Sequence, residues 1–454
     1  MLLKNLIKSC PTEIGNINFS GLCSDSRKLK KGEIFFALKG KKNNRIKFIK
    51  EAIKKKAAAI IVNKDYKITN KAVPIIKTQN INKLLLESCK KFYKAKPKNI
   101  IAVTGTNGKS SVADFFYQIL SQLKVPVASI GTLGIKLKGK FKKISHTTPD
   151  LIELHKQLNY LRKKNINHVI IEASSHGLYQ GRLDGLEFKL GIFTNFSQDH
   201  LDYHRTMKNY FKAKMLLLPK IKKKGFIICD DKLNEFSKLR KETKKNKLKI
   251  ITINKIMKDD PIKNSSNIFG EFQKKNVSMA ILAALSCGLK KAYSKNNFKN
   301  LQNLNGRLEL IKNLPNKGKV FLDYAHTPDA LKNSLLALKN KYKQKINIVF
   351  GCGGERDIKK RKFMALISKQ FCSSIYVTDD NPRNENPQKI RKDIIRYLYG
   401  AKYYEISDRK KAIQKSIKNC GSSEIVLVAG KGHEITQDYG KRILAFSDRS
   451  VIKN

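Results

Sequence analysis

Residues 99–123 read NIIAVTGTNGKSSVADFFYQILSQL and decide the fold of the region around them. The apolar run over 99–103 is typical of a buried strand, and the apolar-rich stretch over 112–123 favours a helix. Between the two, Gly105 and Gly108 let backbone N–H groups face an anion, and the N-terminus of the helix adds its positive dipole end. The stretch therefore predicts a strand, a phosphate-binding loop and a helix in direct succession.

The side chains of this loop suit nucleotide chemistry. Lys109 can reach phosphate oxygens, and a hydroxyl of Ser110 or Ser111 can hold Mg²⁺. The spacing departs from the full Walker pattern, because Val103 stands where the first glycine would be. A chance glycine turn is the alternative, and the loop alone leaves GTPases, kinases, helicases and ligases open.

Length and composition limit the class of protein. A chain of 454 residues predicts two or three domains, and a hydrophobic content of 41% with 29% charged residues indicates a folded protein. No apolar run reaches the roughly eighteen residues of a membrane span, so we expect a cytoplasmic protein without one. The eight cysteines are scattered without a CxxC pair, which favours reduced thiols over a zinc site or disulfides.

The formal net charge of +58 raises the question of a nucleic-acid partner. The lysines are spread over nearly every predicted helix and loop, as at 54–56, 222–224 and 244–245, and form no single basic stripe. We therefore expect a solvated basic surface and no nucleic-acid partner, with steering of anionic substrates as a secondary interpretation. A basic nucleic-acid-binding ATPase stays open as an alternative, which predicts ATP hydrolysis that nucleic acid stimulates.

Alternating strand and helix patterns predict an α/β protein of three domains. Residues 1–95 form the first, with strand-like runs at 33–38 and 58–62 and a helical pattern at 48–56. Pro97 lies among charged residues and marks a domain boundary near this point.

The other two predicted domains cover residues 96–305 and 306–454. The central domain is expected to hold a P-loop-type parallel sheet, and the C-terminal domain a Rossmann-like sheet. Their further strands are expected at 168–172, 190–194, 225–229, 320–322, 346–350, 375–378 and 425–429.

Polar clusters follow two of the central strands. Glu172 ends one strand and precedes a Ser-Ser-His segment, and the next strand runs into a second cluster at 194–204. Because the carboxyl ends of parallel strands share one edge of a sheet, we expect a ligand site there. Glu172 is a candidate Mg²⁺ ligand, with a helix N-terminal carboxylate or a surface salt bridge as the alternative, and His200 is the candidate second metal ligand.

Five ordered motifs carry a resemblance to a known family. They are TGTNGK at 104–109, EASSHGL at 172–178, TNFSQDHLDYH at 194–204, NGRLE at 305–309 and DYAHTPD at 323–329. With these motifs the chain resembles the Mur ligase family over essentially its whole length. The resemblance implies three domains, an N-terminal one for the uridine nucleotide, a central one for ATP and a C-terminal one for the incoming amino acid.

The resemblance also assigns an ATP and metal site. The implied ATP-binding residues are Gly105, Thr106, Asn107, Gly108, Lys109, Ser110, Ser111, Asn276, Arg307 and Asp323. The implied ligands of two Mg²⁺ ions are Ser110, Glu172, His200 and Lys214. Lys109, Glu172, His200 and Lys214 are the implied catalytic residues, with Lys214 carbamylated to N6-carboxylysine. The sequence pattern alone would favour a helix-surface lysine at position 214, and residues 270–273 (GEFQ) depart from the usual Gly-x-Phe-Asn of the family.

Two further groups of residues match family positions for the other substrates. Those for UDP-MurNAc-L-Ala-D-Glu are Ser24, Ser26, Thr147, Thr148, Ser174, Gln180 and Arg182, whereas residues 41–43 diverge from the usual loop. Those for the incoming amino acid are Arg356, Asp380, Asn381, Pro382, Arg383, Gly430 and Glu434. An arginine can clamp a carboxylate with two hydrogen bonds, so Arg383 favours meso-diaminopimelate, which has one carboxylate more than lysine.

The implied reaction is ATP-dependent amide formation in the synthesis of peptidoglycan precursors. The D-glutamyl γ-carboxylate would form an acyl phosphate, which an amine of meso-diaminopimelate attacks. A ligase that adds L-lysine and a folylpolyglutamate synthase are the alternatives within the resemblance. We expect the protein to act as a cytoplasmic monomer on these small-molecule substrates.

Overall fold

The computed structural model describes residues 1–7, 11–38, 45–66, 72–263, 265, 268–293, 298 and 300–454. The chain divides into two compact units. Unit 1 contains Met1–Ile100, Pro126–Val169 and His176–Phe188, and unit 2 contains Ile101–Val125, Ile170–Ser175 and Lys189–Asn454. The division into three domains with boundaries near 96 and 305 stays a prediction.

Unit 1 begins with a four-stranded parallel sheet of order β1-β2-β3-β4. Its strands are β1 (Gly21–Cys23), β2 (Glu33–Phe36), β3 (Ala59–Asn63) and β4 (Ile75–Thr78). The helices are α1 (Leu3–Leu6), α2 (Thr12–Gly15), η1 (Ser26–Lys28), α3 (Arg45–Lys54) and α4 (Ile81–Phe92). Alternate residues of β2 enter two different cores: Ile34 and Phe36 lie in one and Phe35 in the other. Burial on both faces explains why these strands read as continuous apolar runs, and the predicted strands and helix are confirmed.

A second sheet has eight strands in the order β12-β11-β10-β5-β9-β6-β7-β8. They are β5 (Asn99–Thr104), β6 (Val127–Gly131), β7 (Gly134–Leu137), β8 (Lys140–Lys142), β9 (His168–Glu172), β10 (Phe188–Phe193), β11 (Ile221–Cys229) and β12 (Lys249–Thr252). The pairs β10–β5 and β11–β12 are parallel, whereas β6, β7 and β8 form an antiparallel meander. The predicted central strands are confirmed. One expectation is wrong: Lys222, Lys223 and Lys224 belong to β11 and not to a helix or loop, because its first half is exposed to solvent.

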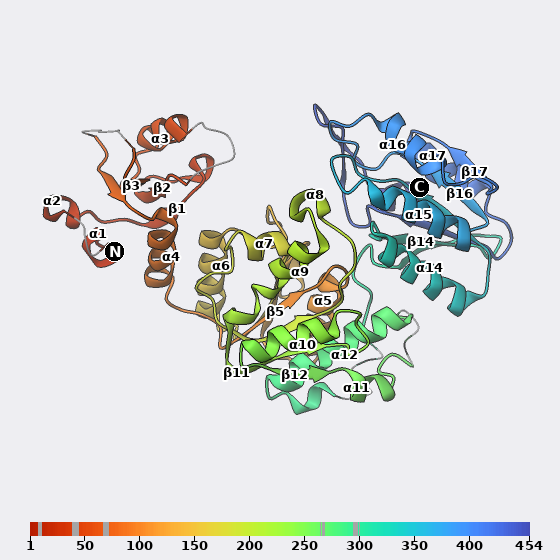
Figure 1. Ribbon diagram of the computed structural model, residues 1–454, viewed down its shortest axis with the longest axis horizontal. Helices are drawn as coiled ribbons and strands as arrows, with labels where there is room; N and C mark the ends of the chain where they lie inside the picture. The colour runs from red at the N-terminus through yellow and green to blue at the C-terminus, as the bar shows by residue number, and fades with distance from the viewer. Residues whose placement is uncertain are drawn as a thin grey trace. The chain divides into compact units, whose positions relative to one another are not determined.

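Helices follow most of these strands. They are α5 (Lys109–Gln122), α6 (Leu151–Lys163), α7 (Ser175–Tyr179), α8 (Leu201–His204), α9 (Met207–Met215), η2 (Leu218–Lys220), α10 (Phe236–Lys245), α11 (Asn254–Lys258), α12 (Glu271–Ser286) and η3 (Lys290–Ala292). Figure 1 shows α9 and α10 as neighbouring yellow-green helices. Helix α5 packs against α12, and most residues of both helices are buried.

The C-terminal part of unit 2 has a six-stranded sheet of order β13-β14-β18-β15-β16-β17, in which only β13 is antiparallel to its neighbour. The strands are β13 (Glu309–Asn313), β14 (Lys319–Asp323), β15 (Ile346–Phe350), β16 (Ser374–Val377), β17 (Tyr403–Glu405) and β18 (Ile425–Ala429), with a separate pair β19 (Thr436–Asp438) and β20 (Ile443–Ala445). The helices are α14 (Pro328–Tyr342), α15 (Lys359–Phe371), α16 (Pro387–Ile395), α17 (Arg409–Lys418) and α18 (Asp448–Lys453). All four strands predicted here are confirmed.

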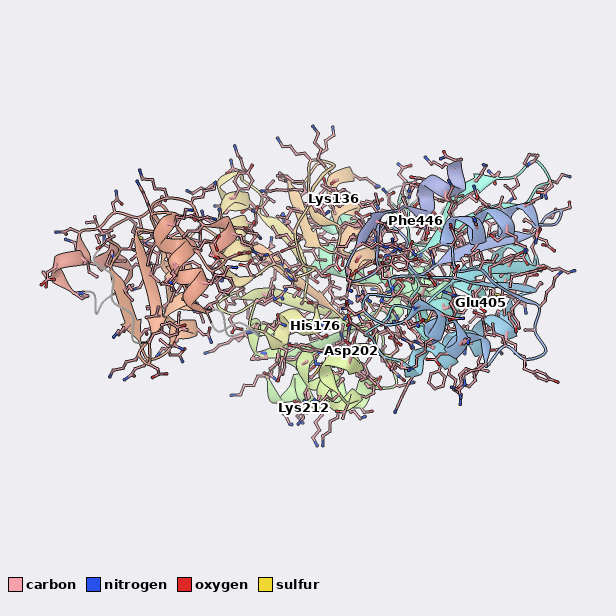
Figure 2. All side chains as sticks on the ribbon, turned by 90° about the horizontal axis from the view of Figure 1, so that it is seen from above. Lys136, His176, Asp202, Lys212, Glu405 and Phe446 are labelled. Carbon is pink, nitrogen blue, oxygen red and sulfur yellow. The ribbon has the colours of Figure 1, made fainter. Side chains whose placement is uncertain are left out.

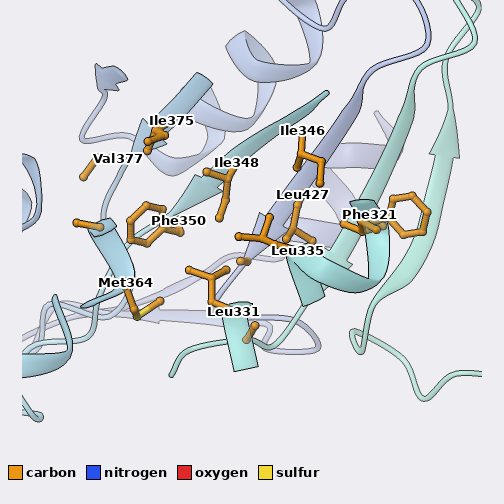
Figure 3. Close-up of a cluster of buried hydrophobic side chains, with 14 of the residues drawn as sticks. Phe321, Leu331, Leu335, Ile346, Ile348, Phe350, Met364, Ile375, Val377 and Leu427 are labelled. Atoms are coloured by element: carbon orange, nitrogen blue, oxygen red, sulfur yellow. The ribbon is translucent and has the colours of Figure 1, made fainter. Parts of the chain in front are cut away.

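Each face of this sheet carries its own core. On one face, side chains of β14, β15 and β18 pack against α14 and α15, as Phe321, Ile348 and Leu335 illustrate in Figure 3. On the other face, Val349 and Val426 pack with residues of α17 and α18. A sheet covered on both faces leaves its strand ends as the place where polar groups can gather.

The surface is basic in all parts of the chain that are drawn. Figure 2 shows long side chains that end in nitrogen projecting from the red-orange, the yellow-green and the blue parts of the ribbon. The seven cysteines within the described ranges are free, and Cys10 lies outside them. Among the helices that the structure describes, we find none long and apolar enough to cross a membrane.

Candidate functional site

The phosphate loop joins β5 to α5 and depends on two glycines. Gly105 has a φ of 143° and Gly108 a φ of 83°, in the region that favours glycine. A Cβ on Gly105 would collide with Thr194 Oγ1, and a Cβ on Gly108 would lie 2.6 Å from Asn276 Oδ1. The glycines therefore allow both the turn and the close approach of neighbouring strand ends and of α12.

Lys109 folds back over this loop. Its Nζ donates hydrogen bonds to the carbonyl oxygens of Gly105 (2.9 Å) and Thr106 (2.8 Å). Burial lowers the pKa of Lys109, and the carboxylates of Glu172 and Asp199 partly offset the effect. An anion in the loop would provide this ammonium with a stronger partner than two neutral carbonyls.

Glu172 lies at the end of β9 and is 3% exposed. Its Oε2 accepts a hydrogen bond of 2.9 Å from Ser110 Oγ, at the first turn of α5. The Arg307 guanidinium reaches Ser110 Oγ at 3.5 Å and stacks 4.1 Å above the Tyr324 ring. Over the described ranges, Arg307 Nε is buried without a hydrogen-bond partner. The structure thus brings Ser110, Glu172 and Arg307 together.

Lys214 lies on α9 and is only 1% exposed, so the pattern-based expectation of a surface lysine is wrong. The reason is that the side of α9 carrying Tyr210 and Lys214 packs on the phosphate loop. Lys214 Nζ donates a 2.7 Å hydrogen bond to the Gly105 carbonyl and lies 4.3 Å from the Tyr210 ring centroid. Burial, with repulsion from Lys109, holds the pKa of Lys214 well below its ordinary value.

His200 has a left-handed φ of 55° directly before α8. Its Nε2 lies 3.3 Å from Asp199 Oδ2, and His326 Nε2 lies 3.9 Å from the same oxygen. Burial alone would raise the pKa of Asp199, but His200, His326 and Lys360 hold it well below its usual range. His200 is thus paired with a carboxylate. Within the described residues, no group of three or more His, Cys, Asp or Glu side chains could hold a metal ion by itself.

A pocket of about 280 Å³ adjoins the loop. Its lining includes six of the residues predicted to bind ATP, namely Asn107, Gly108, Ser111, Asn276, Arg307 and Asp323. Asn107 and Asp329, which come from distant parts of unit 2, meet through a hydrogen bond of 3.0 Å from Nδ2 to Oδ2. The pocket is therefore built from the phosphate loop, α12 and the segment that follows β14.

Two polar side chains of this pocket are fixed by neighbours. Asn276 Nδ2 donates to Gln273 Oε1 at 2.9 Å, and Gln273 Nε2 donates to Asn303 Oδ1 at 2.8 Å. Asp323 accepts hydrogen bonds from the Ser334 hydroxyl and from the backbone N–H of Tyr324 (2.7 Å), while burial raises its pKa. The residue that departs from the family pattern, Gln273, thus orients Asn276.

The residues predicted to bind the amino acid gather at the ends of β15, β16 and β18. Arg383 has a left-handed φ of 55°, and its Nη1 donates to the carbonyl oxygens of Gly354 (2.8 Å) and Asn381 (3.3 Å). Its side chain is 25% exposed, and Nε lies 4.0 Å from Asp438 Oδ2. Pro382 is buried beside it. These bonds hold the guanidinium in place but leave part of it open to solvent.

A hydrogen-bond network supports the same cluster. Asn381 Nδ2 and the fully buried Lys431 Nζ both donate to Glu434 Oε2, each at 2.9 Å. Gly430 has a φ of 111°, and a Cβ there would lie 2.9 Å from Asp380 Oδ2. Arg356 is more peripheral, because its side chain is 43% exposed and pairs with Asp202 at 3.4 Å.

The residues predicted to hold UDP-MurNAc-L-Ala-D-Glu are distributed over both units. In unit 1, Arg182 donates to the Thr148 carbonyl at 2.8 Å and to Gln180 Oε1 at 2.6 Å, and the hydroxyls of Thr147 and Thr132 lie 3.1 Å apart.

The remaining residues of this set are placed separately. Ser26 is buried in unit 1 and donates to Glu51 Oε2 at 2.6 Å, and Ser24 is half-buried nearby in the chain. Ser174 belongs to unit 2. Residues 41–43, where the family loop diverges, lie outside the described residues.

Sequence reasoning missed several residues that shape the site. Asn195 Oδ1 accepts a hydrogen bond of 2.8 Å from the backbone N–H of Asn107. Asp329, Gln273 and Lys431 form hydrogen bonds with Asn107, Asn276 and Glu434, respectively. Asn195 and Asp329 lie inside quoted motifs, and Lys431 follows the predicted residue Gly430, so their position at strand ends could have indicated them. Gln273 gave no signal beyond its departure from the family pattern.

Comparison with known proteins identifies the family. Residues 103–284 match the Mur ligase middle domain, and residues 306–432 match the Mur ligase glutamate ligase domain. A relative from Rickettsia bellii (strain RML369-C) is 39% identical over 96% of this chain and 95% of its own length. The chain belongs to the Mur ligase family. As a Mur ligase it is an ATP-dependent ligase, which excludes the alternative of a basic nucleic-acid-binding ATPase.

Two relatives of this chain share one name. The Rickettsia bellii relative is named UDP-N-acetylmuramoyl-L-alanyl-D-glutamate–2,6-diaminopimelate ligase, as is one from Brucella melitensis that is 35% identical over 97% of this chain and 95% of its own. A solved structure of a ligase with that name has a TM-score of 0.64 at 26% identity, covering 100% of this chain and 98% of the other. The MurF ligase of Thermotoga maritima in complex with ADP also has a TM-score of 0.64, covering 90% and 93%, and at 15% identity it shows the fold alone.

Proposed function

We propose that this Mur ligase joins meso-2,6-diaminopimelate to UDP-N-acetylmuramoyl-L-alanyl-D-glutamate with hydrolysis of ATP to ADP and phosphate. The observation that carries the proposal is the match, across nearly the full length, to ligases named for this reaction. The reaction is a step of peptidoglycan precursor synthesis. We further propose that the protein works as a cytoplasmic monomer, since its nucleotide-linked substrate and ATP are solutes of that compartment.

ATP is proposed to occupy the pocket beside the phosphate loop. Its triphosphate would lie over the backbone N–H groups between Gly105 and Ser111, where Lys109 and Arg307 offset the negative charge. The unpartnered Nε of Arg307, as far as the described residues show, supports this placement because an anion would pair with it. Asn276 is proposed to contact adenine and Asp323 to contact ribose, both from the wall of the same pocket.

The oxygen-rich contact of Ser110 with Glu172 suits Mg²⁺, which prefers hydroxyl and carboxylate ligands. Ser110, Glu172, His200 and a carbamylated Lys214 are proposed to hold two such ions, which would stabilise the charge of the transferring phosphoryl group. The lowered pKa of Lys214 supports the modification, because only a neutral amine can add CO₂ to give a carbamate and release a proton. The carbamate would convert a buried amine into an anionic ligand.

The proposed chemistry forms an acyl phosphate and then an amide. The D-glutamyl γ-carboxylate attacks the ATP γ-phosphorus and ADP leaves; an amine of the amino acid then attacks the acyl carbon and phosphate leaves. Residues Thr147, Thr148, Ser174, Gln180 and Arg182 are proposed to position the muramoyl dipeptide, with Ser24 and Ser26 at the uridine. Most of the rate enhancement would come from positioning and from charge stabilisation.

Arg383 is the residue proposed to select the amino acid. Its guanidinium is held by the Gly354 and Asn381 carbonyls yet remains partly exposed, so it can take the second carboxylate of meso-diaminopimelate. Lysine has no carboxylate at that end. The hydrogen bonds among Asn381, Lys431 and Glu434 would hold these side chains in fixed positions beside Arg383. Arg356, Asp380, Pro382 and Gly430 are proposed to complete the pocket.

The direct test measures ADP release by the purified protein with ATP, Mg²⁺ and UDP-MurNAc-L-Ala-D-Glu. Three reactions are compared: one with meso-diaminopimelate, one with L-lysine and one without an acceptor. We expect turnover with meso-diaminopimelate and formation of the tripeptide product by mass spectrometry. We expect little turnover with L-lysine or without an acceptor. Equal or faster turnover with L-lysine would contradict the substrate assignment, and folate-dependent glutamate addition would support the folylpolyglutamate alternative.

A further inference from the structure

A second cavity of unit 2 lies between α9 and α10, away from the nucleotide pocket. It has a volume of about 970 Å³, and we call it the α9–α10 pocket. Its apolar lining comes from Phe196, Met207, Phe211, Met215, Leu216 and Pro219. A cavity of this size with a mostly apolar wall is typical of a small-molecule site.

Lysines surround this apolar wall. Lys208 and Lys212 come from α9, and Lys238, Lys241 and Lys245 from α10. On α10 the three lysines are spaced three and four residues apart, so they lie on one face of the helix. Lys212 is labelled near the lower edge of the molecule in Figure 2. The lysines would attract an anionic group at the mouth of an apolar cavity.

Two glutamates also line the α9–α10 pocket. Glu242 is paired with Lys245 at 2.9 Å. Glu235, just before α10, has a buried Oε2 for which the described residues offer no hydrogen-bond partner. A buried acceptor without a donor costs free energy, and a donor on a bound molecule would remove that cost. Glu235 lies one helical turn from Lys238, so the donor should be close to the anionic group.

The α9–α10 pocket is connected to the phosphate loop by packed aromatic rings. Phe211, in the wall, contacts Phe196 with ring centroids 5.4 Å apart, and Phe196 contacts Tyr210 at 5.2 Å. The Tyr210 hydroxyl lies 3.2 Å from Thr106 Oγ1, inside the phosphate loop. Helix α9 thus presents Phe211 to the pocket and Lys214 to the loop.

From these observations we infer that the α9–α10 pocket binds a medium-chain fatty acid with a hydroxyl near its carboxylate, and that this binding weakens ATP binding through α9. The aliphatic chain fills the apolar wall, the carboxylate meets the lysines and the hydroxyl donates to Glu235. A ligand that separates α9 from α10 shifts Tyr210 and Lys214 relative to Thr106 and Gly105. This effect requires only that the protein binds ATP, whichever amino acid the enzyme adds.

The test is isothermal titration of the full chain with 3-hydroxydecanoate below its micelle concentration. We expect one saturable site, weaker binding of decanoate, and no binding of decyltrimethylammonium, which reverses the charge. The double variant Lys212→Glu with Lys241→Glu should weaken binding about tenfold or more. The matched variant Lys223→Glu with Lys249→Glu makes the same charge change outside the pocket and should bind within about twofold of the parent.

A second pocket variant tests the site independently, and folding of every variant is measured. Met215→Trp fills the cavity and should also abolish binding, while the melting temperature reports whether each variant is folded. The site is overturned if folded pocket variants bind normally, if the charge-reversed amphiphile binds equally well, or if binding is displaced by anionic vesicles, which would make a membrane the occupant.

The connection to the phosphate loop is tested by linkage. Saturating 3-hydroxydecanoate should raise the Kd for ATP about fivefold in the parent, and ATP should weaken the fatty acid by the same factor. The pocket variants should lose this effect but keep the parent Kd for ATP. An ATP Kd that the fatty acid leaves unchanged would overturn the connection, and a chain that binds ATP but adds no diaminopimelate would affect only the proposed function.

Discussion

The phosphate loop and the loops around Arg383 hold their charged side chains in different ways. In the phosphate loop, Lys109 and Lys214 both donate to the Gly105 carbonyl, so two amino groups share one neutral backbone acceptor. Around Arg383, Lys431 is matched by the carboxylate of Glu434, and Arg383 is tied to two carbonyls. Among the described residues, the amino groups of the phosphate loop have no carboxylate in contact, whereas Lys431 has one and Arg383 Nε lies 4.0 Å from that of Asp438.

The two arrangements predict different roles in catalysis. The phosphate loop gains charge stabilisation only when an anion or a metal-bound carboxylate arrives, so its residues should affect the chemical step most. The hydrogen bonds among Asn381, Lys431 and Glu434 already exist without a ligand, so the residues around Arg383 should affect selection of one substrate. Variants that change kcat and KM separately test this difference between the two regions.

The largest effect is expected for Lys214→Ala. Without the carbamate, kcat for ADP release should fall by about 10³-fold or more, because a ligand of the proposed metal site is lost. A small carboxylate such as formate should restore part of the activity by entering the space that the side chain leaves. The matched change Lys223→Ala, on the exposed part of β11, should leave kcat unchanged. Full activity of Lys214→Ala would contradict the carbamate role.

A smaller effect, confined to one substrate, is expected for Arg383→Ala. The KM for meso-diaminopimelate should rise about 10²-fold, as for the loss of a charged partner, while the KM for ATP stays within about twofold. Arg383→Lys should lose nearly as much, because an ammonium cannot make two parallel hydrogen bonds to a carboxylate. Arg442→Ala is the control on an exposed arginine. An unchanged KM for the diacid would refute the assignment.

The third prediction concerns Gly108→Ala. The added Cβ would press on Asn276 Oδ1, so the KM for ATP should rise about tenfold with little change in the KM for meso-diaminopimelate. Gly139→Ala is a matched control, since Gly139 also has a positive φ of 75° but nothing lies within 4 Å of its Cβ position. If both variants raise the KM for ATP equally, backbone strain and not the contact with Asn276 is responsible.

The smallest effect is expected for Gln273→Leu. Removing the side-chain oxygen leaves Asn276 Nδ2 without its acceptor, so the affinity for ATP should fall about fivefold, as expected for one hydrogen bond. Equilibrium titration with a fluorescent ATP analogue measures it. Gln388→Leu, on the exposed first turn of α16, should have no effect. A parent-like affinity would mean that Asn276 does not depend on Gln273.

Much of the fold could be predicted because its signals are local. Continuous apolar runs such as 99–103 and 346–350 become strands covered on both faces, and Gly105 and Gly108 supply the backbone freedom that a phosphate loop requires. The lysine-rich start of β11 was not recognised as strand, since an exposed strand end carries no apolar pattern. An apolar sequence pattern indicates a strand only where the strand is buried, so exposed strand ends are not predicted from it.

Local patterns thus predicted most strands and helices and the phosphate loop, and the motifs indicated the family. The three-dimensional structure alone shows that Lys214 is buried against Gly105, that Gln273 orients Asn276 and that Asn107 meets Asp329. It also decided that α9 and α10 enclose an apolar cavity between lysines. The physical reason is that burial and pairing of a side chain depend on what packs against it, and those partners lie far away in the chain.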